Sequence, residues 1–141
     1  MRWFRCHFLV TAAALALTAC GGDDVTVEPI EPFEPKLSSI QTQVFDKSCA
    51  FSACHDSDRP ALDLDLTAGA AYAALVGRAA QSKDGGTLVA PSNPEESFLV
   101  RKLRGELNED QGGRMPLGNV PLAEETLLVI ETWIANGAID D

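Results

Sequence analysis

The segment CAFSACH, residues 49–55, places two cysteines and a histidine close together. Two thiols followed directly by a histidine are the arrangement used for covalent haem attachment. Each thiol would form a thioether with a vinyl group of the porphyrin, and the imidazole of His55 would then lie beneath the iron. Four residues separate Cys49 from Cys54, where two is the usual number. The extra pair must therefore bulge away from the ring.

The same residues have simpler interpretations. In an exported protein, Cys49 and Cys54 could form a disulfide. A histidine by itself is more often solvated or hydrogen-bonded than a metal ligand, although its position directly after Cys54 favours the ligand role for His55. The sequence contains no Ser-His-Asp arrangement, phosphate-binding loop or zinc-finger spacing, so it does not indicate a hydrolase or a nucleotide-binding site.

Met115 is a candidate for the second axial ligand, in the loop GGRMPLG at residues 112–118. Glycines let the backbone approach a flat ligand closely, and Pro116 restricts the backbone after the sulfur. A thioether sulfur is a suitable haem ligand, and a His/Met pair raises the reduction potential. A methionine is more often a core residue. This one, however, is the only methionine besides Met1 and lies on no helical stripe.

The elements that must position these residues are expected to be helical. Capping signals and apolar spacing predict four helices, which begin near Ser38, near Thr67, at Pro94 and at Pro121, the last ending before Gly137. Strand-like alternation is confined to a short stretch at residues 62–66. The expected fold class is therefore all-α, with about four short helices and long loops. So thin a core often needs a disulfide, a metal or a cofactor for stability.

The order of these features resembles a class I cytochrome c domain over residues 38–138. The segments that carry the resemblance are FDKSCAFSACH, LDLTAGAAYAALV, PSNPEESFLVRKL, GGRMPLG and IETWIANGA. The chain is especially similar to small cytochrome c-like domains of exported bacterial lipoproteins and of planctomycete-type proteins, with C-x4-C-H in place of C-x2-C-H. The resemblance implies one haem c bound covalently through Cys49 and Cys54. It also implies proximal iron ligation by His55 and distal ligation by Met115.

Residues 1–19 are typical of a bacterial lipoprotein signal peptide. Arg2 and Arg5 precede an apolar run at residues 8–17 that is too short to cross a bilayer. The following LTACG resembles a lipobox, in which Cys20 becomes the lipidated first residue of the mature protein. The alternative is a buried N-terminal helix.

A Pro- and Glu-rich tether is expected at residues 20–37, followed by the cytochrome c-like domain at 38–141. The prolines of the tether recur every third residue between glutamates, which favours an extended, self-repelling chain. An arm packed on the domain is the alternative, because Ile30 and Phe33 are apolar. Gly21, in place of aspartate after the lipidated cysteine, favours the outer membrane.

The net charge of the chain indicates which classes of partner it can bind. The 141 residues carry 11 Lys and Arg against 21 Asp and Glu, a net charge of −10. A chain this acidic is a poor candidate for nucleic-acid binding. We expect redox partner proteins with basic docking patches, and attachment to a membrane through a lipid anchor. Arg101, Lys102 and Arg104 could pair with haem propionates or simply form a solvated helix face.

The expected function is that of a periplasmic or cell-surface monohaem c-type cytochrome in electron transfer. The expected location is the bacterial envelope, lipid-anchored and facing the periplasm or the exterior. An enzyme is not expected, because the chain offers no distal histidine for peroxidase-like chemistry should Met115 leave the iron. The alternative is a non-haem exported lipoprotein with a structural Cys49–Cys54 disulfide, acting as a binding module.

Overall fold

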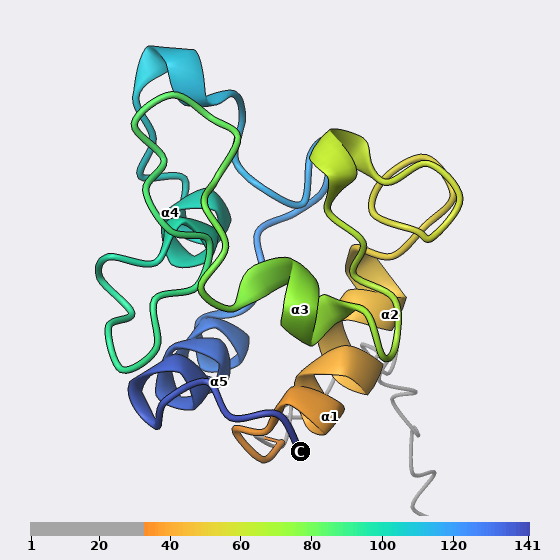
Figure 1. Ribbon diagram of the computed structural model, residues 1–141, viewed down its shortest axis with the longest axis vertical. Helices are drawn as coiled ribbons and strands as arrows, with labels where there is room; N and C mark the ends of the chain where they lie inside the picture. Colours follow the sequence, from red (N-terminus) through yellow and green to blue (C-terminus); the bar gives the residue numbers. More distant parts are fainter. Residues whose placement is uncertain (1–32) are drawn as a thin grey trace, which may run out of the picture.

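The computed structural model describes residues 33–141, which form a small helical fold (Figure 1). The predicted signal peptide, Cys20 and most of the predicted tether lie outside the described residues. The elements in chain order are α1 (Leu37–Ile40), the π-helical turn η1 (Gln41–Phe45), α2 (Asp46–Ser48), the 3-10 turn η2 (Ala61–Asp63), α3 (Ala71–Leu75), α4 (Phe98–Arg104), the 3-10 turn η3 (Glu109–Gln111) and α5 (Glu124–Ala135). From residue 33 onward, β-pairing is limited to isolated bridges between residues 76 and 97. The expectation of a small helical fold is confirmed.

The first predicted helix is a continuous helical segment made of α1, η1 and α2. It begins at Leu37, and no serine side chain caps it. Ser38 instead donates its hydroxyl to a carboxylate oxygen of Asp141 at 2.6 Å, which ties the start of the helix to the end of the chain. Inside the segment the buried Gln41 donates from Nε2 to the carbonyl oxygen of Leu66 at 2.9 Å. This hydrogen bond fixes the helix to the segment that follows η2.

Three helices begin later than predicted. The last of them, α5, begins at Glu124 and not at Pro121. The second helix, α3, begins at Ala71, because Thr67 closes a turn with the carboxylate of Asp65 instead of capping a helix. Pro94 and the two glutamates after it form a turn, and α4 begins only at Phe98. The hydroxyl of Ser97 explains this delay, since it accepts from the Ala90 amide and donates to the Asn93 carbonyl, which closes the turn ahead of the helix.

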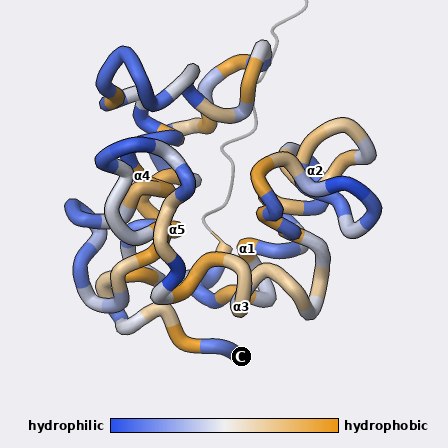
Figure 2. Tube along the Cα trace, turned by 45° about the horizontal axis from the view of Figure 1, so that its top comes forward, coloured by the Kyte–Doolittle hydropathy of each residue, from blue (hydrophilic) through white to orange (hydrophobic). Residues whose placement is uncertain are grey.

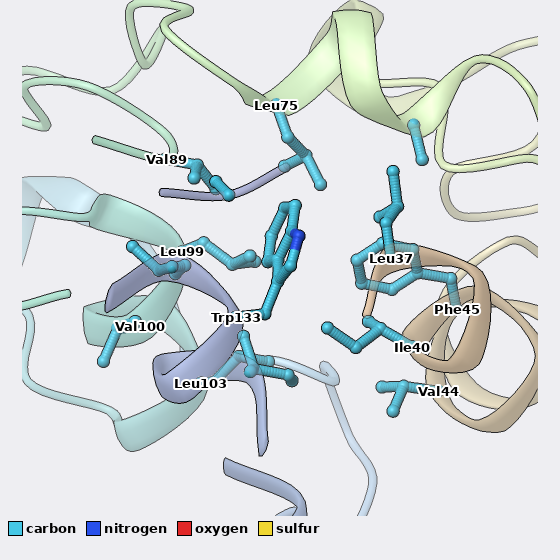
Figure 3. Packing of buried hydrophobic residues seen from close by; sticks show 14 of the residues in the cluster. Leu37, Ile40, Val44, Phe45, Leu75, Val89, Leu99, Val100, Leu103 and Trp133 are labelled. Carbon is cyan, nitrogen blue, oxygen red and sulfur yellow. The ribbon is translucent and has the colours of Figure 1, made fainter. Parts of the chain in front are cut away.

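The core forms where α5 packs against α1 and α4. Trp133 on α5 is 2% exposed, and its indole nitrogen donates to the carbonyl oxygen of Ile139 at 2.9 Å. Figure 3 shows Trp133 between aliphatic side chains from the α3–α4 side and apolar side chains from the N-terminal helical segment. In Figure 2 polar residues are concentrated in the outer loops. No helix between residues 33 and 141 is long and apolar enough to cross a bilayer.

Two residues of the predicted tether contact the helical fold. Phe33 packs against the core, and Leu37 is a buried residue of α1. The last residues assigned to the tether therefore belong to the domain. The leucines at 62, 64 and 66 do not form a strand, because η2 and a left-handed Leu62 with φ of 55° interrupt the extended backbone.

Candidate functional site

Cys49, Cys54, His55 and Met115 all line one cavity of about 510 Å³. This volume lies within the range of sites that hold drug-sized ligands and cofactors. Its walls come from the end of α2 and the loop after it, from η2, from α4 and from the loop that follows η3. Figure 1 shows these segments in yellow, yellow-green, teal and light blue. The fold thus brings Met115 to the same cavity as Cys49, Cys54 and His55, which lie close to one another but far from Met115 in sequence.

The cavity walls are largely apolar. The buried apolar residues among them are Val44, Phe45, Leu66, Ala74, Phe98, Leu99 and Leu103. Charged side chains are few, and they come from Asp63, Arg78, Lys102 and Asp110. A lining of this kind fits a large, flat, mostly apolar group such as a porphyrin better than it fits a polar metabolite.

The 49–55 loop is closed by its own backbone. The amides of Cys49 and Ala50 both donate to the carbonyl oxygen of Phe45, at 2.9 and 2.8 Å, which ends α2 at the first cysteine. The amide of His55 donates back to the carbonyl oxygen of Cys49 at 3.2 Å. The residues between the cysteines form a turn that leaves Phe51 48% exposed.

The two thiols differ in environment. Both are free, with no disulfide joining them. Cys54 is exposed, whereas Cys49 is partly buried against the core. Burial, with a smaller contribution from Cys54, raises the pKa of the Cys49 thiol to about 11. Cys49 is therefore protonated at neutral pH, and because the thiolate is the reactive form, it is a poor nucleophile towards added reagents.

The imidazole of His55 is oriented by a backbone carbonyl. Its Nδ1 lies 3.0 Å from the carbonyl oxygen of Leu64. Because a carbonyl can only accept, Nδ1 must carry the proton, and Nε2 keeps a free lone pair. Metal-binding histidines are commonly held in this way, with one nitrogen donating to a protein acceptor and the other facing the metal. The half-buried His55 is therefore prepared to act as a ligand through Nε2.

Met115 lies in a loop without regular structure that α4 holds in place. Its side chain is half-buried and packs against the core. Its amide donates to the carbonyl oxygen of Lys102 at 2.8 Å. The guanidinium of Arg114 donates to the carbonyl oxygen of Asn119 at 2.8 Å, which draws the two sides of the loop together.

The three basic residues of α4 have protein partners. Arg104 forms ion pairs with Glu124 and Glu131 on α5, at 3.0 and 2.6 Å. Arg101 lies over the ring of Phe98 and donates to the carbonyl oxygen of Gly85. Of the three, only Lys102 lines the cavity. Arg78 also lines it, and the sequence analysis did not select that residue.

Two contributors to the site were missed from the sequence. Leu64 acts through its carbonyl oxygen, which any residue type could supply, so no signal could have identified it. Gln111 is buried and donates from Nε2 to the carbonyl oxygens of Lys83 and Asp84, both at 3.2 Å. Asn108 and Gln111 form a capping box around η3, and their spacing could have indicated this.

Two thiols and an imidazole could also bind a metal ion directly, without a porphyrin. Within residues 33–141, no three side chains of His, Cys, Asp or Glu gather closely enough to hold a metal ion. The CAFSACH residues therefore do not form such a cluster.

Comparison of the chain with protein-family models, with curated proteins and with solved structures gives no match. The interpretation of the cavity therefore depends on the residues that line it.

Proposed function

We propose that the protein is a monohaem c-type cytochrome of the bacterial envelope that transfers electrons through a His/Met-ligated haem. The observation that carries this proposal is the convergence of Cys49, Cys54, His55 and Met115 on one apolar cavity. When bound, the haem would supply one-electron redox chemistry at its iron. The two cysteines would hold the porphyrin through thioethers, and Nε2 of His55 and the sulfur of Met115 would hold the iron.

The chain's own contribution is to orient the ligands and to exclude water. The Leu64 carbonyl fixes the tautomer of His55, and the Lys102 carbonyl fixes the backbone of Met115. The apolar walls would keep water away from the bound group, and burial is one of the factors that set a haem's reduction potential. With His55 and Met115 both holding the iron, no position would be open for a substrate, which favours an electron carrier over an enzyme.

The partner would meet the protein at the rim of this cavity. Phe51, Leu62 and Leu117 line the cavity and are 48%, 64% and 70% exposed. Exposed apolar side chains around a redox centre suit the small, transient contacts that electron-transfer proteins make. The net charge of −10 favours partners with basic docking patches.

Haem attachment is tested on the full chain produced together with a haem-attachment system. The expected product is coloured, keeps its Soret band through acid-acetone extraction, and has an intact mass increased by one haem. A matched variant, His55→Ala, should lose the low-spin spectrum. A colourless protein would contradict the proposal. In that case, a mass lower by two protons would identify the alternative, a non-haem lipoprotein with a Cys49–Cys54 disulfide.

Lipid anchoring is proposed separately and rests on the sequence alone. Cells that express the full chain would be labelled with radioactive palmitate and fractionated. The wild type should carry the label in the membrane fraction, and Cys20→Ala should lose both the label and the membrane association. Equal labelling of the two proteins would show that Cys20 is not the anchor.

A further inference from the structure

Lys102 on α4 contacts the loop of Met115 with both its backbone and its side chain. Its carbonyl oxygen accepts from the amide of Met115 at 2.8 Å. Its Nζ donates to the carbonyl oxygen of Gln111 at 2.9 Å and to that of Gly113 at 2.7 Å. One residue therefore binds the chain at three points between residues 111 and 115.

Helix α4, which carries Lys102, is held in place by the core and by α5. Leu99 and Leu103, its neighbours on α4, are buried in the core, and Arg104 joins the helix to α5. Nζ of Lys102 lies 5.9 Å from the centre of the Phe98 ring, which also faces the cavity. The position of Nζ is therefore determined by the core and not by the mobile end of an exposed side chain.

The glycine backbone at residues 112–113 does not by itself favour one conformation. Residues 112–114 have no regular structure, and Gly112 has a φ of +74°, which is readily accessible only to glycine. Two adjacent glycines lose much conformational entropy when they are ordered. The charge-assisted hydrogen bonds from Nζ offset this loss, because hydrogen bonds to a charged group are stronger than neutral ones.

We propose that Lys102 is a positioning residue for the distal ligand. It holds the 111–115 segment so that the sulfur of Met115 stays at the cavity, and it thereby sets how readily this sulfur leaves the iron. The inference rests on the proposed function, because it requires a haem for Met115 to bind. Two of the three protons on Nζ are donated to carbonyl oxygens of this segment. The main role of Lys102 is therefore to hold the segment, and not to pair with a haem propionate.

The test is a titration of the ferric, haem-loaded full chain with imidazole. Imidazole binds the iron only after Met115 has left it, so its apparent Kd falls as the methionine-free state becomes more populated. Lys102→Leu keeps an apolar side chain that cannot bind iron and removes both hydrogen bonds. We expect it to lower the apparent Kd by about tenfold, and to weaken the absorption band near 695 nm that reports methionine ligation.

Lys83→Met is the matched control, since it removes the same charge on the same side of the fold. Lys83 is 72% exposed and forms an ion pair with Asp110 at 3.5 Å. Its contact with Gln111 runs through the backbone carbonyl, which the substitution retains. The apparent Kd of this variant should equal that of the wild type.

The outcomes separate the two proposals. If haem is bound and Lys102→Leu behaves like Lys83→Met, the role of Lys102 is overturned and the cytochrome proposal stands. If no haem is bound to the wild type, both are overturned. If Lys102→Leu fails to accumulate with haem, the same titration on Lys102→Gln decides. Gln keeps a neutral donor and should lower the apparent Kd by a smaller factor, and no change would overturn the inference.

Discussion

The histidine and the methionine of the site are prepared for different tasks. His55 is held through its own ring, by a backbone carbonyl 3.0 Å from Nδ1. The hydrogen bonds of Met115 involve only its backbone, such as the one from its amide to the Lys102 carbonyl, and its side chain is held by packing alone. A ligand whose side chain is oriented directly stays at the metal more firmly than one that depends on a loop. Methionine is therefore the ligand expected to leave first.

Met115→Ala should leave the haem attached and bound to His55. Because the thioether raises the potential of a His-ligated haem, we expect the reduction potential to fall by on the order of 100 mV. The band near 695 nm should disappear from the ferric spectrum. Leu117→Ala, at another lining position of the same loop, is the control and should keep the band. An unchanged potential and spectrum in Met115→Ala would mean that another group binds the distal face.

The side chains of the site could be predicted from the sequence, whereas the backbone groups that orient them could not. Cys49, Cys54, His55 and Met115 were selected by type and spacing, and all four line one cavity. The Leu64 carbonyl that orients the imidazole was missed, because the leucines around it suggested only a weak strand. A carbonyl oxygen is common to every residue, so its role depends on where the fold places it.

At the scale of elements, a turn after η2 follows the residue whose carbonyl oxygen orients His55. The Asp65 carboxylate accepts from the hydroxyl of Thr67 at 2.7 Å and from its amide at 2.9 Å. This turn directly follows Leu64, whose carbonyl faces His55. The hydrogen bonds from Thr67, the one from its side chain above all, hold the pKa of Asp65 below its ordinary value.

Asp65→Asn should therefore remove a pH-dependent part of the stability. Because the pKa of Asp65 is lower in the folded state, its contribution is present above the ordinary aspartate pKa of about 4 and is lost as the pH falls below that value. The melting temperature of Asp65→Asn should be lower than that of the wild type at pH 6, and the two should converge as the pH falls below the lowered pKa of Asp65. Asp58→Asn, an exposed aspartate of the loop before η2, is the control. A difference that stays constant with pH would contradict this account.

Helices α4 and α5 are joined by the Arg104 guanidinium. The Arg104 side chain is 26% exposed, and it pairs with the half-buried Glu131 and with the more exposed Glu124. Arg104→Met should lower the free energy of unfolding by about 1 kcal/mol, since partly exposed ion pairs contribute little more than this. Urea unfolding at low and high salt measures it, and the loss should shrink as salt screens the pairs.

Lys36→Met is the control for Arg104, because Lys36 pairs with Glu34 on the exposed surface. It should change the urea midpoint much less. If the two variants have the same effect, the bridge between α4 and α5 contributes nothing beyond a surface ion pair.

Helix boundaries were harder to predict than helix identities. Most of the apolar residues expected on α4 and α5 are buried, Leu99, Leu103 and Trp133 among them. Leu128 on α5, which the same spacing selects, is 50% exposed. The start of α4 was placed too early, because Pro94 and the following glutamates are typical of a first helical turn. The hydroxyl of Ser97 forms hydrogen bonds that close a turn there, and sequence spacing alone does not reveal that competition.

At the scale of the whole molecule, the packed core and the cavity occupy different regions of the fold. The packed core gathers around Trp133, where α5 contacts the N-terminal helical segment. The cavity occupies the region between α2, α4 and the loop that follows η3. The low content of long helices predicted a domain that needs an additional group, and the size and position of the cavity agree with that expectation. Its shape could not be deduced, because it is bounded mostly by loops.

The charge distribution leads to a prediction about electron-transfer rates. The cavity lining itself is balanced, with Asp63 and Asp110 against Arg78 and Lys102. The net charge of −10 therefore acts on an approaching partner through the field of the whole molecule and not through a local acidic ring. Such a field extends about 10 Å at 0.1 M salt and is screened at higher salt.

The rate of oxidation of the ferrous protein should consequently depend on the charge of the oxidant. With a small cationic complex, such as hexaammineruthenium(III), the second-order rate constant should fall as the salt concentration rises, because salt screens the attraction. With the anionic ferricyanide ion it should rise, because salt screens the repulsion. Stopped-flow measurements at pH 7 over about 0.01–0.5 M salt cover the relevant screening lengths. Rate constants that respond to salt in the same direction for both oxidants would show that local charges at the rim, and not the overall charge, control the approach.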